Sequence, residues 1–143
     1  MVRLVAALAA ASFLLVGCAG DDSQAGFGVA RQQEVGEVPG VREELGGTVV
    51  IASNGCLHLR LEDGSEPWIV WPPDAEATDD GGVRWGDEAF ADGTRVTGTG
   101  ARVTLEDLPD GGNPDSYFAS FGGFCGADDA GVVAFDSVDP AEG

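Results

Sequence analysis

The stretch GTVVIASNGCLHLRLEDGSEPWIVW (residues 47–71) holds three short apolar runs separated by turn residues. GTVVIAS (47–53) is rich in β-branched residues, and the Asn-Gly pair after it is a strong hairpin signal. CLHLRLE (56–62) alternates, so its leucines share one face and its polar residues the other. PWIVW (67–71) is a third run and stops at two prolines, as at a sheet edge. The stretch predicts three strands in a meander.

The rest of the chain adds short strands but no long helix. Strand character is seen in five further segments: 82–87, 94–100, 101–107, 116–124 and 130–138. DEAFADG (87–93) predicts a helical turn, and Gly98 and Gly100 predict a bend or bulge. Five to seven short strands without a long helix indicate an all-β domain, a small β-barrel, with an immunoglobulin-like sandwich as the alternative.

Three features of this region carry a family resemblance. The GTVV opening, the NGC…LEDG hairpin and the DGTRVTGTG stretch resemble OB-fold-like barrels of secreted bacterial lipoproteins. The resemblance covers residues 47–138 and implies a small OB-like barrel.

The chain begins MVRLVAALAAASFLLVGCAGDD (1–22), and its apolar run from Leu4 to Val16 follows Arg3. A membrane-spanning helix needs roughly 20 apolar residues, so this run is short. A positive start, a short apolar run and small residues before a cut are typical of a secretory signal peptide. An ordinary signal peptide with a chance cysteine, or a short uncleaved anchor, would also fit this composition.

Leu15-Val16-Gly17-Cys18 resembles the lipobox of bacterial lipoproteins. The resemblance implies that the chain is cut before Cys18 and that the Cys18 thiol carries diacylglycerol, with fatty chains such as palmitate. Two acyl chains hold a protein firmly to a membrane. The expected location is therefore the extracytoplasmic side of the cell membrane, with the lipid anchor as the contact to the membrane.

Four segments are expected along the chain. They are a signal peptide (1–17), the lipidated cysteine with a disordered tether (18–45), the β-barrel domain (46–139) and a tail (140–143). The tether prediction follows from abundant Gly, Gln, Glu and Asp, few aromatic residues and no sustained periodicity.

The composition is strongly acidic. Its 143 residues include seven Arg, no Lys and 25 Asp or Glu, for a formal net charge of −18. Nucleic-acid binding depends on Lys and Arg that neutralise phosphates, so this composition excludes nucleic acid as a partner. A Lys-free chain rich in Ala, Gly, Asp, Val and Arg resembles proteins of high-G+C actinobacteria, and a salt-loving archaeal source is the alternative.

Lipidation of Cys18 leaves Cys56 and Cys125, an even number in an oxidising compartment. They are expected to form a disulfide. The alternative is a reactive thiol near His58, the only histidine, but the chain has no CxxC redox motif.

One loop carries oxygen ligands at a spacing suited to calcium. These are Asp107, Asp110, Asn113 and Asp115. Calcium takes six to eight oxygens from such loops, but the EF-hand ligand order and its final bidentate Glu are missing. The cluster is therefore interpreted as acidic turn residues, and neither a metal nor a cofactor is expected beyond the diacylglycerol.

A second group of candidates could form a ligand-binding face. Aromatic rings on OB-like barrels can stack on sugars, which draws attention to Trp68 and Trp71. Alternation puts these two on opposite faces, and a small domain needs large side chains in its core, so core packing is favoured. His58 and Arg60 share the outward face of their strand, where solvated surface is the default expectation.

Catalytic motifs are absent from the sequence: it contains no G-x-S-x-G, H-E-x-x-H, P-loop or dinucleotide fingerprint. We therefore expect a non-catalytic envelope module that presents a surface to an envelope protein or a wall glycan. A small-ligand or calcium-binding lipoprotein is the alternative, and a small hydrolase ranks third because carboxylate pairs are abundant.

Overall fold

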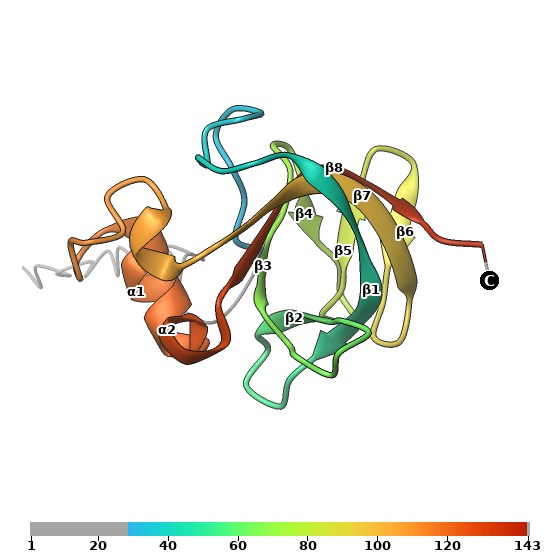
Figure 1. Cartoon of the computed structure of the whole chain (residues 1–143). Coiled ribbons are helices and arrows are strands. Elements are labelled where there is room, and N and C mark those ends of the chain that lie inside the picture. Colours follow the sequence, from blue (N-terminus) through green and yellow to red (C-terminus); the bar gives the residue numbers. More distant parts are fainter. Residues whose placement is uncertain (1–28, 143) are drawn as a thin grey trace, which may run out of the picture.

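The computed structural model describes residues 29–142 and shows a closed five-stranded barrel (Figure 1). Around the barrel the order is β1-β2-β3-β8-β7, in which β3 and β8 pair in parallel and the other neighbours are antiparallel. The strands are β1 (Glu43–Ile51), β2 (Leu57–Arg60), β3 (Trp68–Val70), β7 (Arg95–Val103) and β8 (Val132–Pro140). This is an OB-like barrel, as predicted, and the sandwich alternative is wrong because the sheet closes on itself.

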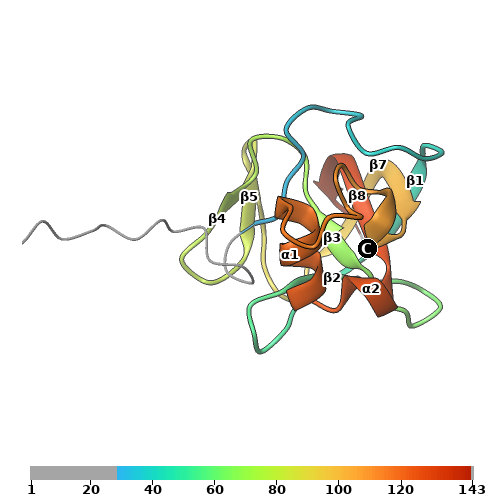
Figure 2. The same cartoon turned by 90° about the vertical axis from the view of Figure 1, so that its left-hand side faces the viewer.

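Two insertions between barrel strands form additional elements outside the barrel. A three-stranded sheet of β4 (Glu76–Ala77), β5 (Val83–Trp85) and β6 (Glu88–Phe90) lies between β3 and β7 in the chain. Between β7 and β8 come η1 (Leu105–Asp107), α1 (Tyr117–Phe124) and α2 (Ala127–Ala130). The two α-helices lie beside the barrel in Figure 1 and in front of it in Figure 2. Within residues 29–142, no helix has the length and apolar character needed to cross a membrane.

The apolar residues form two clusters on opposite sides of the barrel wall. Trp71 packs inside the barrel with Leu59 and Phe135, whereas Trp68 packs outside with Phe118 and other residues of α1. The split follows from strand alternation along and just after β3, which sends neighbouring side chains to opposite faces. The barrel therefore has an inner core, and α1 covers an outer one.

The prediction of a strand over 116–124 is wrong, because this segment is the helix α1. The Ser116 hydroxyl caps the helix by accepting a hydrogen bond from the Ala119 N–H at 3.3 Å. Phe118 and Phe121 lie three residues apart on the buried face, and Phe121 packs 5.3 Å from the Trp68 ring. The helical turn predicted at 87–93 is also wrong, since β6 pairs with β5 there.

The two segments predicted as strands at 94–100 and 101–107 form one nine-residue strand, β7, followed by η1. The predicted bulge is confirmed, because the β7–β8 register shifts between Thr99 and Gly100. Gly100 lies tightly against β8, where a methyl group would overlap the carbonyl oxygen of Ala134. The bulge thus requires a residue without a side chain at this point.

Gly100→Ala is expected to lower the free energy of unfolding by about 2 kcal/mol, since overpacking of a tight contact costs roughly 1–3 kcal/mol. The matched control is Gly112→Ala, whose added methyl meets no atom within 4 Å. Urea unfolding of the full chain followed by tryptophan fluorescence measures both. Equal stabilities of the two variants would show that the bulge does not need glycine.

The prediction that 18–45 is a disordered tether is wrong for the part that the structure describes. Residues 29–42, which we call the strap, lie against the barrel, with Gln32 and Val38 buried. Gln32 Nε2 donates to the Phe135 carbonyl at 2.7 Å, and Arg42 Nε lies 2.8 Å from Asp136 Oδ2. Side-chain hydrogen bonds therefore order a segment that has no apolar periodicity. β1 begins at Glu43, so the barrel domain starts before residue 46, where it was predicted to start.

Residues 140 and 141 of the predicted tail (140–143) belong to the barrel or bind to it. β8 runs to Pro140, and the Ala141 N–H donates to the Arg95 carbonyl at 2.8 Å. The signal peptide (1–17), Cys18 and the remainder of the predicted tether (19–28) lie outside the described residues.

Candidate functional site

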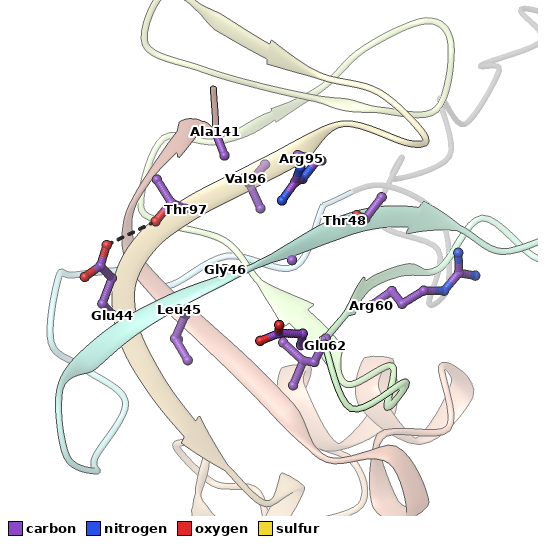
Figure 3. Close-up of a pocket in the computed structure, with 12 residues that line it drawn as sticks. Glu44, Leu45, Gly46, Thr48, Arg60, Glu62, Arg95, Val96, Thr97 and Ala141 are labelled. Atoms are coloured by element: carbon purple, nitrogen blue, oxygen red, sulfur yellow. Dashed lines mark hydrogen bonds between the residues drawn. The ribbon is translucent and has the colours of Figure 1, made fainter. Parts of the chain in front are cut away.

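An open groove of about 670 Å³ lies on the outer face of β1 (Figure 3). We call it the β1 groove. Its lining includes the polar or charged residues Glu44, Thr48, Arg60, Glu62, Arg95 and Thr97, together with Gly46, Gly47 and the apolar residues Leu45, Leu61, Val96 and Ala141. They come from β1, from β2 and the residues after it, and from β7, so three neighbouring strands form the groove.

The register of the strands places two arginines on either side of Thr48. Thr48 pairs with Arg60 on β2 and with Arg95 on β7. Directly opposed residues of antiparallel strands point to the same face, so the three side chains line up across the outer surface. Arg60 Nε lies 2.7 Å from Glu66 Oε1, whereas Arg95 makes no ion pair within residues 29–142. Glu66 offsets the charge of Arg60, so Arg95 supplies the unpaired positive charge near Thr48.

The floor of the groove is formed by Gly46 and Gly47. Gly46 is exposed, and the absence of a side chain there leaves the β1 backbone open to the groove. Gly47 faces inward, where a Cβ would come within 2.9 Å of Leu59 Cγ and 2.5 Å of the Arg60 carbonyl oxygen. Close packing of β1 on β2 therefore needs Gly47, and the depression on the outer face needs Gly46.

The opposite end of the groove is acidic. Glu44 lies beside Thr97, whose hydroxyl donates to Glu44 Oε1 at 3.5 Å, and Glu62 follows the end of β2 (Figure 3). Both carboxylates are exposed. The two carboxylates lie apart, Glu44 on the β7 side and Glu62 on the β2 side of the groove (Figure 3).

The core packing predicted for both tryptophans is confirmed, and the alternative of an aromatic ligand face is wrong. Trp68 and Trp71 are 1% and 0% exposed, on opposite sides of the barrel wall, so neither ring can stack on a ligand. His58 is half-buried, and its Nδ1 lies 2.9 Å from the Glu66 carbonyl oxygen. Among the four predicted residues only Arg60 contributes to the groove.

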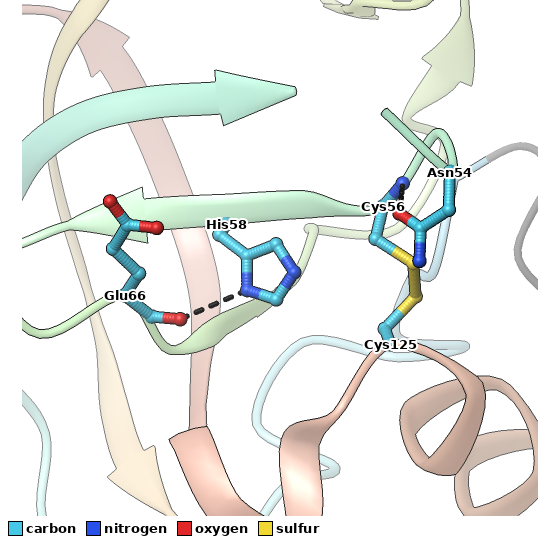
Figure 4. Close-up of a disulfide and its surroundings, with 5 residues drawn as sticks. All are labelled: Asn54, Cys56, His58, Glu66 and Cys125. Carbon is cyan, nitrogen blue, oxygen red and sulfur yellow. Dashed lines mark hydrogen bonds between the residues drawn. A yellow bond between two sulfur atoms is a disulfide. The ribbon is translucent and has the colours of Figure 1, made fainter. Parts of the chain in front are cut away.

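The predicted disulfide between Cys56 and Cys125 is present (Figure 4). It joins the start of β2 to the C-terminal end of α1, with the two Cα atoms 5.6 Å apart. The Asn54 side chain accepts a hydrogen bond from the Cys56 N–H at 3.1 Å and fixes the turn before β2. The alternative of a reactive thiol beside His58 is wrong, because both cysteines are buried and bonded.

The calcium candidates serve local turns. The Thr104 N–H and hydroxyl both donate to Asp107 Oδ2 at 2.9 Å, and these bonds lower the pKa of Asp107 below its ordinary value. Asn113 Oδ1 accepts from the Asp115 N–H at 3.1 Å, and Asp110 occupies a left-handed turn position. In the part of the chain described, no three His, Cys, Asp or Glu side chains gather to hold a metal ion.

Sequence reasoning missed Glu44, Thr48, Glu62 and Arg95. Their signal is the strand register, which aligns Arg60, Thr48 and Arg95 across three strands and cannot be read from any one of them. No protein-family model matches the chain, and neither a curated protein nor a solved structure shows significant similarity to it. The site is therefore defined by its own geometry: an OB-like barrel with an open, charged groove over β1.

Proposed function

We propose that this chain is a lipid-anchored, extracytoplasmic binding module that acts without catalysis and holds an envelope partner in the β1 groove. The observation that carries the proposal is the groove itself. It is open, about 670 Å³ in volume, and lined by charged, hydroxyl and apolar side chains over the β1 backbone at Gly46 and Gly47. Such a surface offers hydrogen bonds and charge to a polar ligand.

The anchor is supported by the residues that resemble a lipobox, Leu15 to Cys18. A disulfide between Cys56 and Cys125 fits an oxidising compartment, since disulfides persist mainly outside the cytoplasm. A diacylated Cys18 would keep the domain at the membrane, with the chain between Cys18 and the strap as the link to the barrel.

The partner is a polar component of the envelope, either a protein segment or a wall glycan with its attached peptides. The acidic composition repels nucleic acid and anionic lipid headgroups. Against that background, Arg95 places a positive charge without an ion-pair partner among the described residues at one side of the groove, whereas Glu66 pairs with Arg60. A partner that carries carboxylates would meet attraction there and repulsion over most of the remaining surface.

Site-directed photocrosslinking in intact cells tests the proposal. A photoreactive amino acid at Thr97 in the groove is expected to give a defined adduct with an envelope component. The same residue at Glu88 on β6 serves as the control position. Arg95→Glu should abolish the Thr97 adduct, whereas Arg84→Glu, the same charge change at an exposed arginine of β5, should leave it. Equal adducts at both positions, or an adduct unaffected by Arg95→Glu, would contradict the proposal.

A further inference from the structure

We propose that the β1 groove binds its partner by strand addition, in which an extended peptide with basic side chains pairs with the free edge of β1 at residues 43–47. This inference rests on the proposed binding function and commits it to one class of partner, a protein segment. It follows from main-chain groups of β1 that no residue between 29 and 142 pairs.

β1 changes its pairing along its length. Residues 43–47 pair with β7 only, and Thr48 is the first residue of β1 that also pairs with β2. β2 ends at Arg60, and the chain then turns back, with the Leu61 N–H donating to the Ser65 carbonyl at 2.9 Å. The first five residues of β1 therefore have a neighbouring strand on one side only.

The direction of the main-chain groups shows which of them are unpaired. In a strand the N–H and C=O of successive residues point to alternate sides. The Val49 N–H donates to the Thr94 carbonyl and the Val49 carbonyl accepts from the Gly93 N–H, both at 2.8 Å and both on the β7 side. The groups of Glu44 and Gly46, at odd separations from Val49, therefore point to the β2 side. In the described part of the chain, neither residue has a backbone partner on that side.

Space for a further strand lies along this free edge. The β1 groove borders it on the outer face, and a second hollow of about 280 Å³ borders it where β1 begins. Leu45, Gly46 and Glu62 line both hollows, and Gly46 is exposed and adds no side chain. Unpaired strand edges take up extended peptides through main-chain hydrogen bonds. A glycan lacks the regularly repeated N–H and C=O pairs that match such an edge.

The side chains around the free edge favour a basic peptide. The second hollow is lined by four carboxylates and one guanidinium, which belong to Glu43, Glu44, Glu62, Asp63 and Arg102. A lysine or arginine side chain of the peptide meets net attraction here, and an acidic one meets repulsion. The same carboxylates oppose pairing with a second copy of this edge, because like charges opposite each other destabilise a strand pair. The occupant is therefore a segment of a different protein.

Amide hydrogen exchange of the ¹⁵N-labelled full chain in detergent micelles tests the inference. The probe is acetyl-Lys-Val-Lys-Val-Lys-amide, whose five residues match the length of the free edge. One control is the same peptide methylated on every backbone nitrogen, which keeps the side chains and the charge but cannot donate main-chain hydrogen bonds. The other control is acetyl-Glu-Val-Glu-Val-Glu-amide.

The lysine peptide is expected to slow exchange of the Glu44 and Gly46 amides at least tenfold, because their N–H groups gain acceptors. The Val49 amide, already bonded to Thr94, should not change. Neither control peptide should protect Glu44 or Gly46.

A charge-neutral variant tests the preference for a basic peptide. Glu62→Gln should raise the Kd of the lysine peptide at least threefold, since it removes one carboxylate beside the free edge. Glu88→Gln is the matched control, because Glu88 is an exposed residue of β6 outside both hollows, and it should leave the Kd unchanged.

The outcomes separate this inference from the proposed function. Equal protection by the lysine peptide and its methylated form would overturn strand addition, because charge alone would then explain binding. Absence of protection by the lysine peptide would overturn it too, and equal protection by the glutamate peptide would overturn the basic preference. In each case a defined Thr97 crosslink would still support the proposed function, whereas its absence would contradict that function as well.

Discussion

Asp136→Ala is expected to lower the free energy of unfolding by about 3 kcal/mol, since it breaks a partly buried ion pair together with further hydrogen bonds, and hydrogen bonds to charged groups contribute roughly 1.5–3 kcal/mol each. The Asp136 side chain is 14% exposed and accepts from Arg42 Nε at 2.8 Å and Gln32 Nε2 at 3.1 Å. The Gly36 N–H donates to the same carboxylate at 3.3 Å. One side chain on β8 therefore holds three points of the strap, and its loss leaves the Arg42 guanidinium without its partner.

The matched control is Glu76→Ala, which breaks the exposed pair between Glu76 and Arg84. Exposed ion pairs contribute about 0–1 kcal/mol, so this variant should keep nearly the stability of the wild type. Urea unfolding measures both, and hydrogen exchange of the Val38 amide, which donates to Gln32 Oε1, reports on the strap directly. If Asp136→Ala cost no more than Glu76→Ala, the strap would not depend on this carboxylate.

The double substitution Cys56→Ala with Cys125→Ala is expected to lower the free energy of unfolding by about 4 kcal/mol, because the disulfide restricts a long loop in the unfolded chain. The two cysteines are 69 residues apart in the sequence. In the folded state the bond also ties α1 to the barrel, so its loss weakens the cover over Trp68.

Guanidinium unfolding of the oxidised wild type, the reduced wild type and the double variant measures this effect. The reduced wild type and the variant should unfold at similar, lower denaturant concentrations, with the fluorescence of the buried tryptophans as the signal. A variant as stable as the oxidised protein would show that packing alone fixes α1 against the barrel.

Local patterns predicted the elements whose structure depends on neighbouring residues. The alternation of Leu57 and Leu59 with His58 is confirmed by burial, because a strand inverts its side chains at every residue. The glycines of β7 marked the bulge, and the count of cysteines predicted the disulfide. These features needed no knowledge of distant contacts.

Features that depend on distant partners were not predictable in this way. Residues 116–124 are nearly all apolar, aromatic or glycine, a composition that suits a buried strand as well as a buried helix. Packing against the Trp68 ring, on the outside of the barrel, favours the helix. Gly122 of α1 lies so close to this ring that a Cβ at position 122 would come within 2.9 Å of a ring carbon. The strap is ordered by Asp136, about 100 positions away, and no local period signals that contact.

The β1 groove was predictable only in part. The outward direction of Arg60 followed from alternation, but its alignment with Arg95 needs the register of β1 against both β2 and β7. A shift of one residue in either pairing would turn that arginine to the other face. Only the pairing of β1 with β2 and β7 brings Arg60 and Arg95 to one surface.

The proposed lipid anchor at Cys18 is tested most directly by the intact, non-reduced mass of the chain extracted from its native membrane. We expect a polypeptide that begins at Cys18 and carries the added mass of diacylglycerol, with Cys56 and Cys125 each lighter by one hydrogen. A chain that retains residues 1–17, or one with an unmodified Cys18 thiol, would contradict the proposed anchor and the location that depends on it.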